Sequence, residues 1–90
     1  MSDTTEISDI IEDATFDFTM GDSDQAISKL EAVLDANPDS FEAWHALCEI
    51  HYSAKSYEAA LRAAEQAHSI RPDDLFINTS LSRIWLELGS

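Results

Sequence analysis

The chain has little cysteine, glycine and positive charge, and it has no long apolar run. Its single cysteine, Cys48, excludes an internal disulfide. With two glycines in 90 residues it has no glycine-rich phosphate loop, and no Ser/His/Asp arrangement stands in a supporting context. No stretch approaches about 18 apolar residues, the length that crosses a membrane, and the N-terminus lacks the basic segment of a signal peptide. We therefore expect neither an enzyme nor a membrane protein, and we expect a cytoplasmic location.

Acidic residues outnumber basic ones by 18 to 5, which gives a formal net charge of -13. Such a surface repels nucleic acids and anionic lipids, because binding to either depends on Lys and Arg neutralising phosphates. The acids that precede the first basic residue, Lys29, are Asp3, Glu6, Asp9, Glu12, Asp13, Asp17, Asp22 and Asp24. One interpretation is a solvated helix face with a solubilising tail, and the alternative is a docking surface for a basic segment.

Residues recur along the chain at a spacing of 34. The pairs are Pro38 and Pro72, Ala26 and Ala60, Asp39 and Asp73, Leu47 and Leu81, Val33 and Ala67, and His51 and Trp85. A fixed period of this length, with helical spacing inside each unit, is typical of a helix–turn–helix repeat array. Such arrays hold other proteins far more often than they catalyse reactions.

Apolar residues at helical spacing predict five helices. The first covers residues 7–20 and ends at Gly21, since glycine readily adopts positive φ. Asp22 caps the second helix with Gln25 as its capping-box partner, and Pro38 stops it because the residue before a proline avoids the α region. Candidate N-caps of the other three helices are Asp39 (in a box with Glu42) or Ser40, then Ser56, then Asp73 or Asp74. No stretch shows the sustained alternation of a strand.

Residues 41–74 resemble a tetratricopeptide repeat. The family pattern is Trp-x2-Leu-Gly-x2-Tyr, then Ala-x3-Phe, then Pro, and Trp44, Leu47, Ala60 and Pro72 match it. Cys48 replaces the small glycine, His51 replaces the tyrosine, and the small Ala64 replaces the larger aromatic residue. The resemblance implies an all-α fold of antiparallel helix pairs, stacked as a short right-handed solenoid of five helices. It divides residues 7–90 into a repeat at 7–40, a repeat at 41–74 and a half repeat at 75–90, after a flexible acidic N-terminus at 1–6.

The first repeat has two alternative registers in its first helix. Strict counting places Asp13 and Asp17 at positions that are normally buried. Removing one residue from the turn places Ile11, Ala14 and Phe18 there instead. Because burying two unpaired carboxylates costs several kcal/mol, we expect the second register.

The resemblance also implies a concave groove lined by the first helix of each pair. The groove candidates are Asp9, Glu12, Phe16 and Met20, then Glu42, His45, Glu49 and Tyr52, then Phe76, Thr79, Arg83 and Leu86. They are acidic and aromatic, which suits a basic or amphipathic peptide, and Phe16 and Tyr52 are able to stack on Arg or Lys. An ordinary exposed face is the alternative. One subgroup of the family clamps C-terminal carboxylates with Lys, Arg and Asn, but Ala46, Glu49, Thr79 and Ser80 stand at those positions here, so we expect no acidic-tail binding.

His45-x2-Cys48-x2-His51 has the spacing of metal ligands. On a helix these side chains spread through about 120°, so only neighbouring pairs share a direction. Structural zinc sites need four converging ligands. We therefore expect no metal and no cofactor.

The last predicted helix has more apolar surface than a terminal helix of a repeat array normally shows. Ile77, Leu81 and Ile84 are able to pack on the fourth helix, whereas Trp85 and Leu88 would normally be covered by a sixth helix. We predict that Ile84, Trp85 and Leu88 form an oligomer or partner patch. Either the natural protein continues beyond residue 90 or the patch self-associates, for which a twofold homodimer is the simplest closed solution.

These features together predict a non-catalytic protein–protein interaction module, acting as adaptor, scaffold or co-chaperone. Two alternatives stay open. One is a small acidic secretion-type chaperone that shields an apolar client segment, and the other is a structural oligomerisation module.

Overall fold

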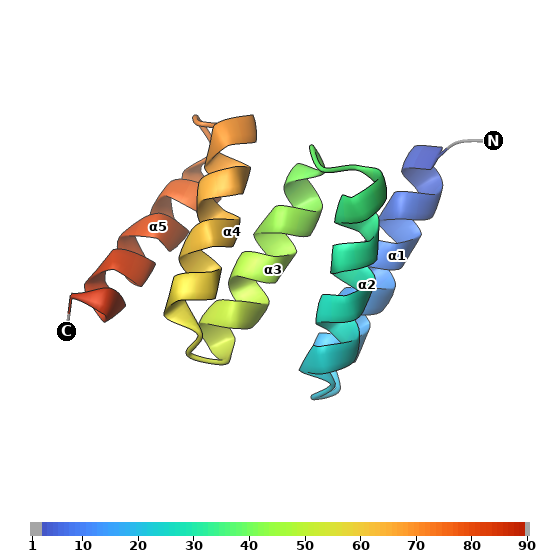
Figure 1. Cartoon of the computed structure of the whole chain (residues 1–90), viewed down its shortest axis with the longest axis horizontal. Helices are drawn as coiled ribbons and strands as arrows, with labels where there is room; N and C mark the ends of the chain where they lie inside the picture. Colours follow the sequence, from blue (N-terminus) through green and yellow to red (C-terminus); the bar gives the residue numbers. More distant parts are fainter. Residues whose placement is uncertain (1–2, 90) are drawn as a thin grey trace.

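The computed structural model describes residues 3–89, with side chains from residue 9 onward, and within that range every regular element is a helix (Figure 1). The five helices are α1 (Asp3–Thr19), α2 (Ser23–Ala36), α3 (Phe41–Ser53), α4 (Tyr57–Ile70) and α5 (Leu75–Leu88). The all-α prediction and the number of helices are therefore confirmed for this part of the chain. Helix α1 begins at Asp3 and so includes residues before the expected start at Ile7. None of the described helices is both long and apolar enough to cross a membrane.

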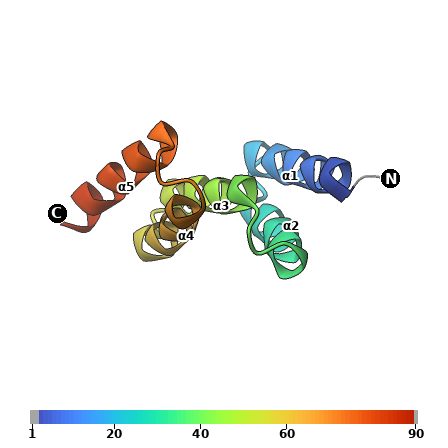
Figure 2. The ribbon, with the colours of Figure 1, turned by 90° about the horizontal axis from the view of Figure 1, so that it is seen from above.

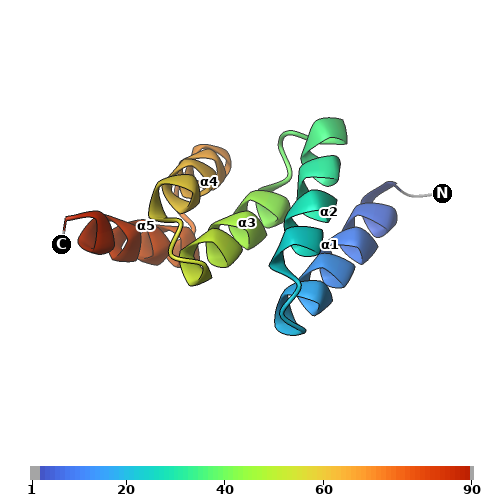
Figure 3. The ribbon, with the colours of Figure 1, turned by 60° about the horizontal axis from the view of Figure 1, so that its bottom comes forward.

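The helices form an elongated stack in which neighbours along the chain pack together. Helices α1 and α2 make one antiparallel pair, α3 and α4 make the next, and α5 packs on α4 and α3. The molecule measures 45 × 30 × 19 Å, with α1 and α5 at opposite ends of its long axis (Figure 1). Figure 3 shows the same order from below, with α2 between α1 and α3. The stack is thus built from repeated pairs that each cover part of the next.

The two turns inside the helix pairs have the same backbone conformation, and both lie at the lower end of the molecule in Figure 1. Gly21 has a φ of 91° and Lys55 a φ of 64°, and these positions are one period of 34 apart. The N–H of Asp22 donates to the Asp17 carbonyl oxygen at 2.8 Å. The N–H of Ser56 donates to the His51 carbonyl oxygen at the same distance. The repeat seen in the sequence is therefore also a repeat of main-chain hydrogen bonds.

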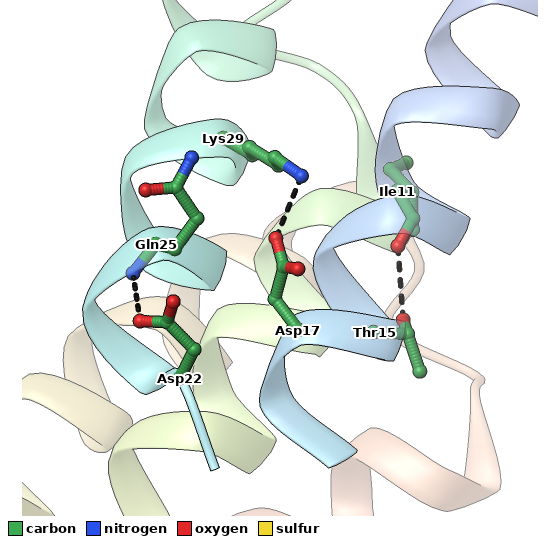
Figure 4. Close-up of polar contacts among 6 residues, drawn as sticks. All are labelled: Ile11, Thr15, Asp17, Asp22, Gln25 and Lys29. Atoms are coloured by element: carbon green, nitrogen blue, oxygen red, sulfur yellow. Dashed lines mark hydrogen bonds and ion pairs between the residues drawn. The ribbon is translucent and has the colours of Figure 1, made fainter. Parts of the chain in front are cut away.

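Side-chain caps fix where most of the helices begin. The backbone N–H of Gln25 donates to the Asp22 carboxylate at 3.2 Å, which confirms Asp22 as a cap (Figure 4). Ser40 and Asp74 take the same role for α3 and α5, with bonds of 3.3 and 3.0 Å. Asp39 and Asp73, the alternatives, are therefore not the caps. Ser56 occupies the N-cap position of α4 without a side-chain bond.

The register of α1 is the one that keeps the carboxylates out of the core. Ala14 is fully buried, and Ile11 and Phe18 pack beside it, as expected. Asp13 is exposed, whereas Asp17 is half-buried against α2. Figure 4 shows its carboxylate reaching the Lys29 ammonium, 2.6 Å away. The ion pair explains why a carboxylate is tolerated beside the core.

The core is made largely of small side chains where α3 and α4 meet. The buried residues of α4 are all alanines: Ala60, Ala63, Ala64 and Ala67. The largest fully buried side chains come from the helices around it: Leu30, Cys48, Ile77 and Ile84. These alanines pack with residues of α3 in one core cluster, and because alanine ends at Cβ it allows two helices to approach closely.

Candidate functional site

Two helices flank α3 on each side, and a cavity opens on each of these two faces of the molecule. Figure 2 shows α1 and α5 on one side of α3, and α2 and α4 on the other. We call the face between α1 and α5 the inner face and that between α2 and α4 the outer face. The predicted groove residues come from the three helices of the inner face, apart from Met20, which follows α1.

All twelve predicted groove residues have at least partly exposed side chains on α1, α3 and α5 or the residue after α1. The structure brings some of them together. The rings of His45 and Phe76 lie 6.4 Å apart, which joins α3 to α5. Glu49, Tyr52 and Arg83 line a small pocket between the same two helices. Asp9, Glu12 and Phe16 are exposed on α1, and Met20 is exposed directly after it.

A cavity of about 360 Å³ opens on the inner face between α1 and α3. Its lining residues are Ile11, Thr15, Phe18, Glu42, His45, Ala46, Glu49 and Ile50. The α1 side of this cavity is therefore formed by two residues that the sequence assigned to the core, together with Thr15. The sequence missed them as lining residues because a residue at the edge of a buried stripe faces both the core and the cavity.

Charge at the inner cavity comes mainly from two carboxylates on α3. Glu42 lies 3.4 Å from the Arg71 guanidinium, and Glu49 lies 3.4 Å from Nε2 of His45. Both carboxylates are well exposed, so they remain accessible to a partner. The cavity thus combines an apolar floor with an acidic rim.

An aromatic row leads from the start of α3 to the surface of α5. The Arg71 guanidinium stands 4.5 Å above the Phe41 ring, Phe41 stacks on His45 at 5.9 Å, and His45 faces Phe76. Phe76 ends the row with 73% of its surface exposed. Arg71 thus contacts both the Phe41 ring and the Glu42 carboxylate.

The outer face carries a larger cavity, of about 600 Å³, which the sequence analysis did not predict. Its lining residues are Glu31, Leu34 and Asp35 of α2, Trp44, Leu47 and His51 of α3, and Ala59, Arg62, Ala63, Glu65 and Gln66 of α4. Burial lowers the pKa of His51 below its usual value; the Glu31 carboxylate opposes this shift and Arg62 adds to it. The run of alanines in α4 was the available signal, since small side chains leave room beside a helix.

The three residues with metal-like spacing point in different directions. His45 faces the inner cavity and His51 the outer cavity, while Cys48 is buried between them. Burial raises the pKa of the Cys48 thiol to about 11, and the nearby Glu49 carboxylate adds to the shift. Within residues 9–89 no group of three or more His, Cys, Asp or Glu side chains is placed to hold a metal ion.

The predicted patch on α5 needs one correction. Ile84 is fully buried in the core, so it does not belong to an exposed surface. Trp85 and Leu88 are 56% and 37% exposed, and the same helix also exposes Leu75, Phe76 and Leu86. Ile84 and Trp85 point about 100° apart on the helix, which places one against the core and the other outside.

Comparison with known proteins gives the chain a family. The model of the family described as tetratricopeptide repeat matches residues 18–84. The human Superkiller complex protein 3 is 30% identical over 69 residues, which are 77% of this chain and 4% of the human protein. The chain therefore spans a small fraction of that relative's length. No solved structure gives a significant match.

Proposed function

The chain belongs to the tetratricopeptide repeat family, whose members serve as protein–protein interaction modules, and from this premise we propose that its inner face binds a basic amphipathic peptide segment of a partner protein. The observation that carries the proposal is the inner cavity, because it pairs an apolar floor with two exposed carboxylates. The module acts as an adaptor or scaffold and performs no catalytic step itself.

The apolar floor provides the anchor for the peptide. Ile11 and Phe18 of α1 face Ala46 and Ile50 of α3 across the cavity. A cavity of about 360 Å³ has room for one or two large apolar side chains, since pockets for whole drug-sized ligands begin near 300 Å³. Burying one such side chain contributes about 1.5–3 kcal/mol before the cost of ordering the peptide.

The acidic rim sets the charge of the peptide. Glu42 and Glu49 stand on one side of the floor, and the whole chain carries a formal charge of -13. A basic segment is therefore attracted from a distance and is held by the rim once bound. The exposed Phe76 ring adds a surface for an Arg or Lys side chain, which contributes about 0.5–1 kcal/mol at an exposed site.

A second candidate function uses the exposed apolar surface of α5. Trp85 is 56% exposed and Leu75 is 79% exposed, and both belong to the last helix of the described chain. Self-association through this helix would make the chain an oligomerisation module, and contact with an apolar client segment would make it a chaperone. Sedimentation equilibrium over a wide concentration range tests the oligomerisation module, since only self-association makes the average mass rise with concentration.

The test of the proposed function is a calorimetric titration with a synthetic peptide that carries leucines for the floor and lysines for the rim. Glu49→Lys is expected to weaken its binding about tenfold, because reversal at the rim removes an attraction and adds a repulsion, together about 1.4 kcal/mol. Glu58→Lys is the matched control: Glu58 is exposed on α4, so the variant makes the same change of net charge away from the inner face. Equal weakening by both variants would show a general charge effect and would contradict a site at the inner cavity.

A further inference from the structure

We propose that the outer face is a second docking surface, which takes a basic amphipathic helix of a partner protein in the groove between α2 and α4. The inference is independent of the proposed function, because the two cavities share no lining residue. Occupation of both faces would let the chain hold two protein segments at once.

The shape of the outer groove fits a helix. Within residues 3–89, α2 and α4 both pack on α3 and do not contact each other. The groove therefore has a helix for each wall and a third helix for its floor (Figure 2). A helix laid into it would contact three others, as in a bundle, and would present apolar side chains at i, i+3, i+4 and i+7.

The size of the groove follows from the sequence of α4. The apolar part of its wall toward the groove is Ala59 and Ala63, which end at Cβ, and the floor includes Trp44 and Leu47. Trp44 is fixed in place by a hydrogen bond from its Nε1 to the Pro38 carbonyl oxygen at 2.8 Å. The result is a cavity of about 600 Å³ with an apolar base and a fixed aromatic side chain.

The rim of the groove selects a basic partner. Glu31 and Asp35 stand on the α2 wall, and Glu65 stands on the α4 wall. Arg62 is the cation among the lining residues, so the acids exceed it by two when His51 is neutral. A helix with lysines flanking its apolar stripe relieves the repulsion among these carboxylates, and an acidic helix would increase it.

His51 supports the apolar character of the base. His51 lines the same groove as Glu31, whose carboxylate favours the protonated ring and so raises the pKa of His51. Burial has the larger effect, and the pKa of His51 is lowered. The other charged groups around it are Arg62 on α4, which also lowers the pKa, and the rim acids Asp35 and Glu65. Desolvation at this point indicates an environment in which apolar side chains of a partner are well accommodated.

The test is an NMR titration of the isotope-labelled protein with a designed helix. The probe is an amidated peptide of about 14 residues made of leucine, alanine and lysine, with leucines along one face; isolated helices much shorter than this are unstable. The expected result is a saturable shift of the Trp44 indole N–H and of the Leu34, Leu47 and Ala63 amides. A second peptide with glutamate in place of every lysine is the control and is expected to leave these signals unmoved.

Two kinds of variant separate the charge from the shape of the groove. Glu31→Lys with Asp35→Lys reverses the α2 rim without touching the packing, and it is expected to weaken binding at these signals at least about tenfold. Ala59→Trp fills the groove and is expected to abolish binding there. Ala32→Trp is the matched control, since Ala32 is an exposed alanine on α2 that does not line the cavity. Glu49→Lys on the inner face is expected to leave the outer signals and their affinity unchanged.

Three outcomes would overturn the inference. They are shifts confined to the inner face at Ile11, Thr15 and Ala46, equal shifts with the acidic peptide, or equal binding by the Ala59→Trp and Ala32→Trp proteins. The first of these would leave the proposed function intact. If the Glu49→Lys protein loses the inner-face shifts and keeps the outer-face shifts in the same titration, the result supports both surfaces.

Discussion

Replacing Ile84 by alanine should strongly destabilise the domain, whereas the same replacement of its neighbour Trp85 should not. Ile84 is fully buried, and Trp85 is 56% exposed on the adjoining face of α5. At about 0.8 kcal/mol for each of roughly three carbons removed, Ile84→Ala loses about 2.4 kcal/mol of transfer free energy. The cavity left behind raises the total to about 3–4 kcal/mol. That is a large share of the roughly 5–15 kcal/mol available to a small domain.

Urea unfolding followed by far-UV circular dichroism measures both variants. Trp85→Ala should cost about 1 kcal/mol or less, because much of its ring is already in water. Hydrogen exchange then locates the damage: α5 amides should lose protection in Ile84→Ala while those of α1 and α2 keep most of theirs, since α5 packs only on α4 and α3 among the described helices. A loss below about 1 kcal/mol for Ile84→Ala would refute the assignment of this side chain to the core. A loss for Trp85→Ala that grows with protein concentration would show that Trp85 is covered by a second copy.

Three further predictions follow from single residues. Lys55 has a φ of 64° at the position where the first turn has Gly21, so Lys55→Gly should raise the free energy of unfolding by about 0.5–1 kcal/mol in thermal or urea unfolding; a decrease would contradict strain at this turn. Burial lowers the pKa of His51 below 6.5, so the unfolded chain binds its proton more tightly than the folded one. The stability that this group contributes is present above about pH 6.5 and is lost as the pH falls through the folded pKa. Unfolding of the wild-type and His51→Gln proteins, compared at roughly pH 4.5–8, should show that the variant loses less stability on acidification. The Cys48 thiol has a pKa of about 11 and is buried, so iodoacetamide should modify it slowly at pH 8 in the folded protein and rapidly in urea; fast modification without denaturant would refute its burial.

The fold could be predicted from the sequence because its packing residues recur. Pro38 and Pro72 stop two helices at the same point of the period, and Ala26 and Ala60 are both fully buried in the structure. The sequence did not decide between Asp39 and Ser40 as the cap of α3. Both residue types are good caps, and residue types alone do not fix the first residue of a helix to within one position.

The candidate surfaces were less predictable because they depend on distances between helices that do not touch. The outer cavity exists because α2 and α4 stand apart on α3, and a period of 34 carries no information about that separation. Trp44 and His51 therefore read as packing residues, although they also line the outer face. Ile84 was assigned both to the face that packs on the fourth helix and to the exposed patch, and in the structure only the first assignment holds.

The position of α3 between two pairs of unconnected helices has a mechanical consequence. Within residues 3–89, α1 does not contact α5 and α2 does not contact α4. Bending the stack about α3 therefore meets little resistance from packing across either face. Such a bend widens the spacing on one face as it narrows the spacing on the other.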